Sequence, residues 1–398
     1  MYHPIQITDN VYYTGVNDRR KSLFENQWPL PYGVSYNSYL ILDDKAALID
    51  TVDIGLADIF LKKIESVLNG KTIDYLIINH MEPDHSGSVR LIRERYPDIR
   101  IIGNAKTLEM LNGYFGITDG VYEIKEGEEL DLGKRRLQFF LTPMLHWPET
   151  MMTYSRVDKM LFSGDAFGSF GALNGGVVDD SIDTELFWNE MRRYYACIVG
   201  KYASPVQKAL EKLQDVPLDY ICATHGPVWR RHISRVLDLH KQWSLYQGVP
   251  GVVIAYGTMY GNSEQMAEAI ARGIVAGDVS EVKMYDVART DASVILSDVF
   301  KYSGLVIGSS TYMNGLLPGI ESLLRKIEAR TVKNRIFAAF GSFTWAGVSI
   351  KKILPFAEQL QWDMAGNVEE KQALKPEKYE ECFALGQKIA EKIRKNSI

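Results

Sequence analysis

The sequence predicts an α/β protein in two parts, with two sheets flanked by helices followed by a five-stranded doubly wound sheet. Three observations predict this fold class. Strand patterns are dense in the first third of the chain. A break rich in glycine and proline stands at residues 247–251. After the break, buried strand patterns alternate with amphipathic helix patterns to the last residues.

The composition narrows the class of protein. Of 398 residues, 46% are hydrophobic and 24% are charged, and the formal net charge of −5 gives no reason to expect nucleic acid as a partner. No apolar run approaches the roughly 20 residues that a membrane helix needs, and the N-terminus lacks a signal-peptide pattern. The three cysteines are isolated, so neither a disulfide framework nor a C-x-x-C iron centre is expected. We therefore expect a cytoplasmic protein without a membrane partner.

The first part begins with patterns that we expect to pair as consecutive antiparallel strands, at Val11–Tyr13, Ser38–Leu42 and Ala46–Asp50. An amphipathic helix with apolar residues from 59 to 68 follows and ends at Asn69-Gly70. Further strands are expected at Tyr75–Ile78, Ile99–Ile102, Gln138–Leu141 and Met160–Phe162, and further helices at Ser88–Tyr96 and Trp229–Tyr246. This order predicts two sheets with helices packed against them.

One short segment, directly after an apolar strand pattern, carries His80, Glu82, Asp84 and His85 with the spacing H-x-E-x-D-H. The carboxyl end of a strand is where open α/β folds bind ligands. Pro83 favours an extended backbone at the residue before it, which lets these side chains fan out. A polar turn is the alternative, but turns seldom contain two histidines and a glutamate. Two imidazoles and two carboxylates predict a site for a hard or borderline metal ion.

Three later strand ends or turns offer further ligands, at His146, Asp165 and His225. A lone buried histidine is more often hydrogen-bonded than bound to a metal. Three such positions together with the dense segment favour a single shared site. The other histidines have no such context, and His232 and His240 fall within a helix pattern.

The break divides the chain into two domains, which we place at residues 1–248 and 251–398. Strands of the second domain are expected at Val252–Tyr256, Glu281–Tyr285, Gly304–Gly308, Arg335–Phe340 and Trp362–Val368. Helices are expected at Glu264–Val275, Leu316–Ile327 and Pro376–Lys395. The alternation predicts five parallel strands with helices on both faces.

Three loops of the second domain are expected at one edge of its sheet. The first joins the first strand to the first helix, and its hydroxyls and backbone N–H groups favour a phosphate. It has neither a Gly-Lys-Ser/Thr nor a G-x-G-x-x-G motif, so a mononucleotide is favoured over a P-loop substrate or a dinucleotide. Tyr312 and Trp345 offer flat faces for a flavin ring, with ordinary surface aromatics as the alternative. The predicted flavin contacts are Thr258, Met259, Tyr260, Gly261, Asn262, Ser263, Ser310, Thr311, Tyr312, Asn314, Gly315, Ser342, Phe343, Thr344, Trp345, Ala346 and Gly347.

Taken together, these residues resemble the flavodiiron proteins over essentially the whole chain. The first domain resembles the metallo-β-lactamase fold, an αββα sandwich, and the second resembles flavodoxin. The motif H-x-E-x-D-H differs from the H-x-H-x-D-H of the zinc hydrolases because Glu82 stands where they have a histidine. A carboxylate adds negative charge and hard oxygen donors, which favours redox-active iron over zinc.

The resemblance implies FMN and two iron ions as cofactors. The ligand sets it implies are His80, Glu82 and His146 for one iron, Asp84, His85 and His225 for the other, and Asp165 as a bridge between them. The implied reaction is reduction of dioxygen to water or of nitric oxide to nitrous oxide, and the sequence does not separate these substrates. Tyr195 is the expected hydrogen-bond donor beside the irons, with Tyr194 as the alternative.

The resemblance also implies partners. Electrons are expected from a separate donor, such as rubredoxin or a reductase. A head-to-tail homodimer, alone or as a dimer of dimers, would bring the flavin of one chain to the irons of the other. The flavodoxin-like loops depart from the usual pattern at Tyr260 and Ser263, where threonines are common, and at Thr344, where glycine is expected. Tyr260 is therefore expected to contribute through its backbone N–H.

Two other functions would use the same features. A zinc hydrolase fused to a flavodoxin-like electron carrier would use the same histidines and aspartates, but Glu82 disfavours it. A pure electron carrier with a relic first domain would not need all seven candidate ligands. We therefore predict a flavodiiron oxidoreductase.

Overall fold

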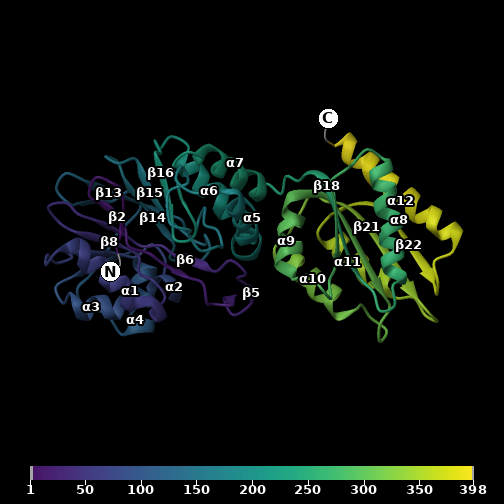
Figure 1. Cartoon of the computed structure of the whole chain (residues 1–398), viewed down its shortest axis with the longest axis horizontal. Helices are drawn as coiled ribbons and strands as arrows, with labels where there is room; N and C mark the ends of the chain where they lie inside the picture. Colours follow the sequence, from purple (N-terminus) through teal and green to yellow (C-terminus); the bar gives the residue numbers. More distant parts are fainter. Residues whose placement is uncertain (1–2, 397–398) are drawn as a thin grey trace. The chain divides into compact units, whose positions relative to one another are not determined.

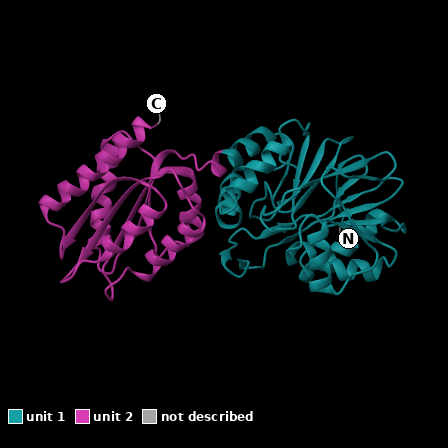
Figure 2. Cartoon of the chain, turned by 180° about the vertical axis from the view of Figure 1, so that it is seen from behind, with its two compact units in different colours: residues 1–241 teal, residues 242–398 magenta. Residues whose placement is uncertain are grey.

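The computed structural model describes residues 3–396, and the chain divides into two compact units between Lys241 and Gln242 (Figure 2). This division falls inside helix α7 (Ile233–Ser244). The predicted domain limits, 1–248 and 251–398, lie slightly further along the chain. Among the described helices, none is long and apolar enough to cross a membrane.

Unit 1 contains two large sheets. The seven-stranded sheet has the order β1 (Ile5–Thr8), β2 (Val11–Tyr13), β7 (Tyr39–Ile41), β8 (Ala47–Ile49), β9 (Tyr75–Ile77), β10 (Arg100–Gly103), β11 (Val121–Glu123). The six-stranded sheet has the order β12 (Glu129–Asp131), β13 (Arg136–Leu141), β14 (Met151–Ser155), β15 (Met160–Gly164), β16 (Tyr220–Ala223), β17 (Val228–Trp229). Strands β2, β7 and β8 pair antiparallel in that order, which confirms the prediction for the first strands.

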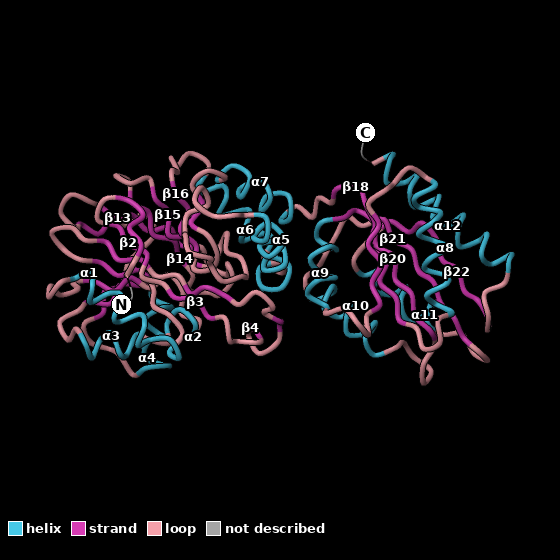
Figure 3. Tube along the Cα trace, in the orientation of Figure 1, coloured by secondary structure: helices cyan, strands magenta, loops and turns pink. Residues whose placement is uncertain are grey.

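Helices cover the outer faces of these sheets, with α1–α4 on one side and α5–α7 on the other (Figure 3). Their bounds are α1 (Ala57–Leu68), α2 (Pro83–Ser86), α3 (Val89–Arg95), α4 (Ala105–Phe115), α5 (Glu185–Tyr194) and α6 (Ala203–Leu213), and a π-helical turn (Tyr195–Val199) extends α5. The buried side chains of α1 include Phe60, Ile64 and Leu68, and the helix ends at Asn69 in the left-handed conformation. The predicted αββα sandwich is therefore confirmed.

Four short strands between β2 and β7 were not predicted: β3 (Val16–Asp18) pairs with β6 (Val34–Tyr36), and β4 (Leu23–Phe24) pairs with β5 (Trp28–Pro29). Strands of two or three residues are too short to leave a periodic pattern in the sequence. They matter for the site, because Phe24 packs its ring 5.3 Å from that of His225.

Unit 2 is a five-stranded sheet in the order β19 (Val282–Asp286), β18 (Val249–Gly257), β20 (Tyr302–Ser310), β21 (Ile336–Phe343), β22 (Asp363–Lys371). All neighbouring strands run parallel. Helices α8 (Asn262–Ala276) and α12 (Pro376–Lys395) lie on one face, and α9 (Ala292–Lys301), α10 (Pro318–Ala329) and α11 (Ser349–Gln359) on the other (Figure 1). The predicted doubly wound sheet is confirmed, whereas α9 and α11 were not predicted individually.

The expected break at residues 247–251 is partly wrong. Strand β18 already begins at Val249, which pairs with Tyr302. The pairing shifts register before Val252, where Pro250 has no N–H to offer. Tyr246 directly precedes this segment, and its carbonyl oxygen accepts a hydrogen bond from the buried Arg335 at 2.8 Å. The segment is therefore bound to unit 2 and is not a free linker.

Candidate metal centre and flavin loops

The seven candidate ligands follow strands from both sheets of unit 1. The segment from His80 to His85 follows β9 of the seven-stranded sheet, and His146, Asp165 and His225 follow β13, β15 and β16 of the six-stranded sheet. Because β15 and β16 run parallel, their carboxyl ends share one edge of that sheet. The two sheets thus bring ligands from four strand ends to one place, as the sequence predicts.

The ligand side chains form two adjoining groups, in each of which the ligand atoms lie within 4.8 Å of one another: His80, Glu82, His146 and Asp165, and Asp84, His85 and His225. All seven side chains are buried. The carboxylate of Asp165 reaches both groups, because its Oδ2 lies 3.1 Å from His146 Nε2 and its Oδ1 lies 3.0 Å from His85 Nε2. A bridging ligand requires this position.

A single helical turn, α2, begins after the first two candidate ligands of the motif and contains the last two. Pro83 occupies its first position, and the preceding Glu82 is extended with φ −57° and ψ 139°, which confirms the predicted effect of the proline. His80 and Glu82 precede the turn and face the first group. Asp84 and His85 lie within it and face the second.

Glu149 supports the first group, and the sequence did not single it out. Its Oε1 lies 2.7 Å from His80 Nδ1 and also accepts a hydrogen bond from the backbone N–H of Met81 at 2.9 Å. Glu149 stands three residues after His146, on the same loop. Only the folded contact reveals its role, because His80 lies far away in the sequence.

Two further residues orient the second group and the bridge. The carbonyl oxygen of Ser35, on β6, lies 2.7 Å from His225 Nδ1. The hydroxyl of Thr224 donates to Asp165 Oδ1 at 2.5 Å. The one sequence feature that could have identified Thr224 is its position next to the candidate ligand His225. These contacts hold the ligands in place before any ion binds.

The three predicted flavin loops meet at one edge of the sheet of unit 2. One buried serine from each loop contributes a hydroxyl to a small cluster: Ser263, Ser310 and Ser342, whose oxygen atoms are separated by 2.9 to 3.1 Å. Thr311 N–H also donates to the carbonyl oxygen of Ser342 at 2.8 Å. Parallel strands place these loops together, because the carboxyl ends of β18, β20 and β21 share an edge.

The first loop leads directly into α8. Thr258 Oγ1 accepts a hydrogen bond from the N–H of Gly261 at 3.0 Å, and Gly261 has a φ of 89°, which suits glycine. Within residues 3–396, no side chain caps α8, which begins at Asn262. Its first backbone N–H groups therefore remain available for an anion.

The loops at this edge of the unit 2 sheet also carry large, exposed side chains. We call Met259, Tyr260, Tyr312, Met313 and Trp345 the apolar rim; Trp345 is 86% exposed and Tyr260 is 91% exposed. Met313 was not among the predicted contacts. Of the remaining predicted contacts in the second and third loops, Phe343 is the last residue of β21. Asn314, Thr344 and Ala346 are exposed, and Gly315 and Gly347 are partly buried.

Comparison with known protein sequences identifies both halves. Residues 34–226 match the family described as ODP family beta lactamase, and residues 254–386 match flavodoxin. The chain is 33% identical over 409 residues to a nitric oxide reductase of Moorella thermoacetica, with 99% of this chain and 100% of that protein covered. It is also 33% identical over 393 residues to the anaerobic nitric oxide reductase flavorubredoxin of Escherichia coli, covering 97% of this chain and 82% of that protein.

Solved structures agree with these relatives. Rubredoxin oxygen:oxidoreductase from Desulfovibrio gigas superimposes with a TM-score of 0.95 at 31% identity, covering 99% of both chains. The flavodiiron protein of Giardia intestinalis gives a TM-score of 0.94 at 26% identity, covering 98% of this chain and 97% of the other. The chain belongs to the flavodiiron family. As a flavodiiron protein it is an oxidoreductase whose cofactors are FMN and a diiron centre.

The residues of this flavodiiron protein fit both cofactors. Both carboxylate oxygens of Asp84 and Nε2 of His225 are buried without a hydrogen-bond partner among the described residues. Buried polar atoms of this kind need a partner, and a metal ion would supply it. Four imidazoles with three carboxylates suit iron. In unit 2, the uncapped start of α8 suits a phosphate, and the exposed ring of Trp345 suits a flavin.

Charges within the cluster of this flavodiiron protein compensate one another. Burial opposes ionisation of Asp165, but the charges of His85 and His80 hold the pKa of its carboxyl well below its usual range. Burial likewise opposes a charge on His146, yet hydrogen bonds with Asp165 and Glu82 raise its pKa to about 9. Protons on the imidazoles thus balance the carboxylates, and incoming metal ions must displace those protons.

The two adjacent tyrosines lie in different surroundings. The ring of Tyr194 lies 5.4 Å from that of His225, and burial followed by the charge of Asp165 raises the pKa of its hydroxyl well above the usual value. The ring of Tyr195 instead lies 5.4 Å from that of His240. Successive residues of a helix point about 100° apart, so only one of the pair can face the ligands. The structure places Tyr194, the alternative, against the candidate ligands.

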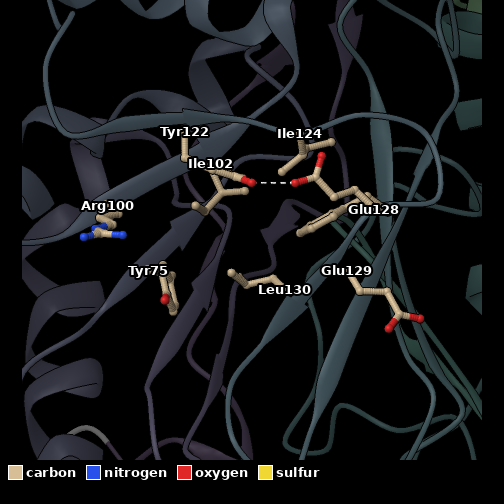
Figure 4. Close-up of a pocket in the computed structure, with 9 residues that line it drawn as sticks. Tyr75, Arg100, Ile102, Tyr122, Ile124, Glu128, Glu129 and Leu130 are labelled. Carbon is tan, nitrogen blue, oxygen red and sulfur yellow. Dashed lines mark hydrogen bonds between the residues drawn. The ribbon is translucent and has the colours of Figure 1, made fainter.

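A small cavity in unit 1 is separate from these sites. Its volume is about 80 Å³, and side chains from β9 to β13 line it. The hydroxyl of Tyr122 donates to Glu128 Oε1 at 2.6 Å beside it (Figure 4). None of the predicted ligands or flavin contacts lines this cavity.

Proposed function

We propose that this flavodiiron protein reduces nitric oxide to nitrous oxide, and dioxygen to water, at its seven-ligand centre with electrons that pass through FMN. The observation that supports this most directly is the pair of buried ligand groups on either side of Asp165. The two relatives named nitric oxide reductase support the first substrate. The structural neighbour named rubredoxin oxygen:oxidoreductase supports the second.

The proposed ligand assignment follows the two groups. One iron would be held by His80, Glu82 and His146, the other by Asp84, His85 and His225, with Asp165 shared between them. When bound, the irons would supply electrons and bind a small oxygen-containing substrate. The protein's part is to hold the ligands through Glu149, Ser35 and Thr224 and to keep bulk water out of a site whose side chains are all buried.

Each reaction also consumes protons. Two molecules of nitric oxide, two electrons and two protons give nitrous oxide and water, whereas dioxygen takes four electrons and four protons to give two water molecules. The hydroxyl of Tyr194 keeps its proton, because burial and the nearby carboxylates raise its pKa. We assign it, in place of Tyr195, as the hydrogen-bond donor nearest the centre.

The apolar rim supports a homodimer in which the flavin edge of one chain meets the metal unit of the other. Five large side chains with exposed surface around a single ligand site form a contact surface of the kind that protein partners cover. We propose a head-to-tail arrangement of two copies, either alone or as a dimer of dimers.

We propose that electrons reach FMN from a separate donor. The names of the relatives, flavorubredoxin and rubredoxin oxygen:oxidoreductase, favour rubredoxin as the donor. We propose rubredoxin or a comparable small carrier in the cytoplasm as the partner.

One preparation tests the proposal. The protein is purified without oxygen, iron, zinc and FMN are quantified, and the reduced protein is mixed with nitric oxide or with dioxygen in single-turnover experiments. We expect two irons and one FMN per chain, with rapid reoxidation of the flavin and formation of nitrous oxide or water. Stoichiometric zinc, which the zinc-hydrolase alternative predicts, or a reduced protein inert to both gases, would overturn it.

A further inference from the structure

The two ligand groups are supported unequally by their surroundings. In the first group, His80 Nδ1 faces the Glu149 carboxylate at 2.7 Å, and both side chains are 0% exposed. In the second group, His225 Nδ1 faces the neutral carbonyl oxygen of Ser35 at the same distance of 2.7 Å. Among the described residues, Nδ1 of His85 has no hydrogen-bond partner. A full negative charge therefore stands behind an imidazole of the first group, and a dipole behind one of the second.

The carboxylate behind His80 determines how that imidazole presents itself. Because Glu149 accepts the proton of Nδ1, the lone pair is left on Nε2. Nε2 is the atom that faces the rest of the first group, at 3.2 Å from Glu82 Oε2 and 3.3 Å from His146 Nε2. Glu149 thus aims the nitrogen at the position where an ion would sit, and it makes that nitrogen a stronger donor.

Glu149 is held firmly enough for this role. Its Oε1 also accepts from the backbone N–H of Met81 at 2.9 Å, and its own carbonyl oxygen accepts from Asn104 Nδ2 at 2.5 Å. The following residue, Thr150, ties the loop back on itself through a hydrogen bond from its hydroxyl to the carbonyl oxygen of Thr142 at 2.5 Å. The loop that carries Glu149 also carries His146, so one rigid segment serves the first group twice.

We propose that Glu149 is a positioning residue that makes the two metal positions unequal, so that the ion at His80 binds more tightly and is oxidised more readily than its neighbour. A buried negative charge stabilises the more highly charged state of an ion, and a more basic imidazole binds any divalent ion more tightly. The inference rests on the proposed function, because it assigns different properties to the two halves of that same centre.

The test compares Glu149→Gln with the wild-type chain. The glutamine keeps the size and one acceptor oxygen but removes the charge. Metal-free protein is titrated anaerobically with ferrous iron against a competing chelator, and the potential of each iron is then measured. We expect one of the two ions to bind about 10- to 100-fold more weakly and its potential to move in the positive direction. The second ion and the FMN potential should stay unchanged.

Ser35→Ala is the matched control. It removes a hydroxyl that accepts from Gly226 N–H at 2.8 Å beside the second group but leaves the carbonyl behind His225 intact. This variant should leave the first ion unaffected. If Glu149→Gln does not fold, Glu149→Asp takes its place. The aspartate keeps the charge but is too short to reach both partners, and the same selective loss is expected.

The outcomes separate the two proposals. A wild-type chain that binds no iron overturns the proposed function. A wild-type chain with two irons, combined with variants that weaken both ions equally or neither, overturns only the role of Glu149.

Discussion

The candidate metal centre of unit 1 and the flavin loops of unit 2 differ in how deeply their side chains are buried. In unit 1 every candidate ligand is buried and several are already held by side-chain or carbonyl partners. In unit 2 the three loops combine a cluster of buried serine hydroxyls with the exposed apolar rim, where Trp345 is 86% exposed. From this difference we infer that metal binding depends on the identity and orientation of particular side chains. The flavin loops depend more on their backbone path, so single side chains matter less there.

The largest expected effect comes from removing a ligand of the first group. His146→Ala should reduce nitric oxide and dioxygen turnover to the background rate, because it removes a proposed iron ligand and, among the described residues, leaves His80 as the one imidazole of the first group. FMN in unit 2 should remain bound, which flavin absorbance would show. Turnover at the wild-type rate would show that His146 is not a ligand of the centre. It would also contradict the inference that the metal centre depends on particular side chains.

A second effect concerns the stability of unit 1. Burial lowers the pKa of His240 to about 4, below its ordinary value of about 6.5. As the pH falls, the His240 imidazole therefore binds a proton more readily in the unfolded chain than in the folded one. The free energy of unfolding is highest above about pH 6.5 and decreases as the pH falls toward 4, by about 3 kcal/mol in all. His240→Phe should weaken this acid sensitivity of unit 1 unfolding.

The measurement is denaturant unfolding of unit 1 between pH 4 and 7, followed by tryptophan fluorescence. His232→Phe is the matched control, because this histidine is only partly buried and lies just before α7. Equal acid sensitivity of the wild-type and His240→Phe proteins would contradict the expectation.

A smaller effect is expected at the flavin rim. Trp345→Ala removes a flat face from the third loop and should weaken FMN binding by about 1 kcal/mol, or roughly fivefold in Kd. Fluorescence titration of FMN into flavin-free protein measures this change. Full retention of FMN by the variant would argue against stacking on Trp345.

The smallest effect is expected at Tyr260, which is even more exposed than Trp345. Because Tyr260 is expected to act through its backbone N–H, Tyr260→Ala should change the Kd for FMN by less than about twofold. The same titration decides the point and also serves as the control for Trp345. A loss as large as that of Trp345→Ala would show that the side chain of Tyr260 takes part in binding.

Much of the fold was predictable because it rests on local patterns. The final helix, Pro376–Lys395, has the predicted bounds, and Asn69 ends α1 where the sequence placed the stop. The short strands β3 to β6 escaped notice because two or three residues carry no period. Strand β18 began earlier than predicted, because its pairing with Tyr302 outweighs the local preference of Pro250 against a strand.

The sequence by itself determined which chemical groups this protein offers and that they stand at strand ends, because residue type and periodicity are local properties. Only the tertiary structure decided that Asp165 contacts both groups, that the Glu149 carboxylate contacts His80 Nδ1, and that Tyr194 packs against His225. These relations join residues that are distant in the chain or differ only in direction. Such distances and directions depend on how two sheets and their loops pack, and no local pattern contains that information.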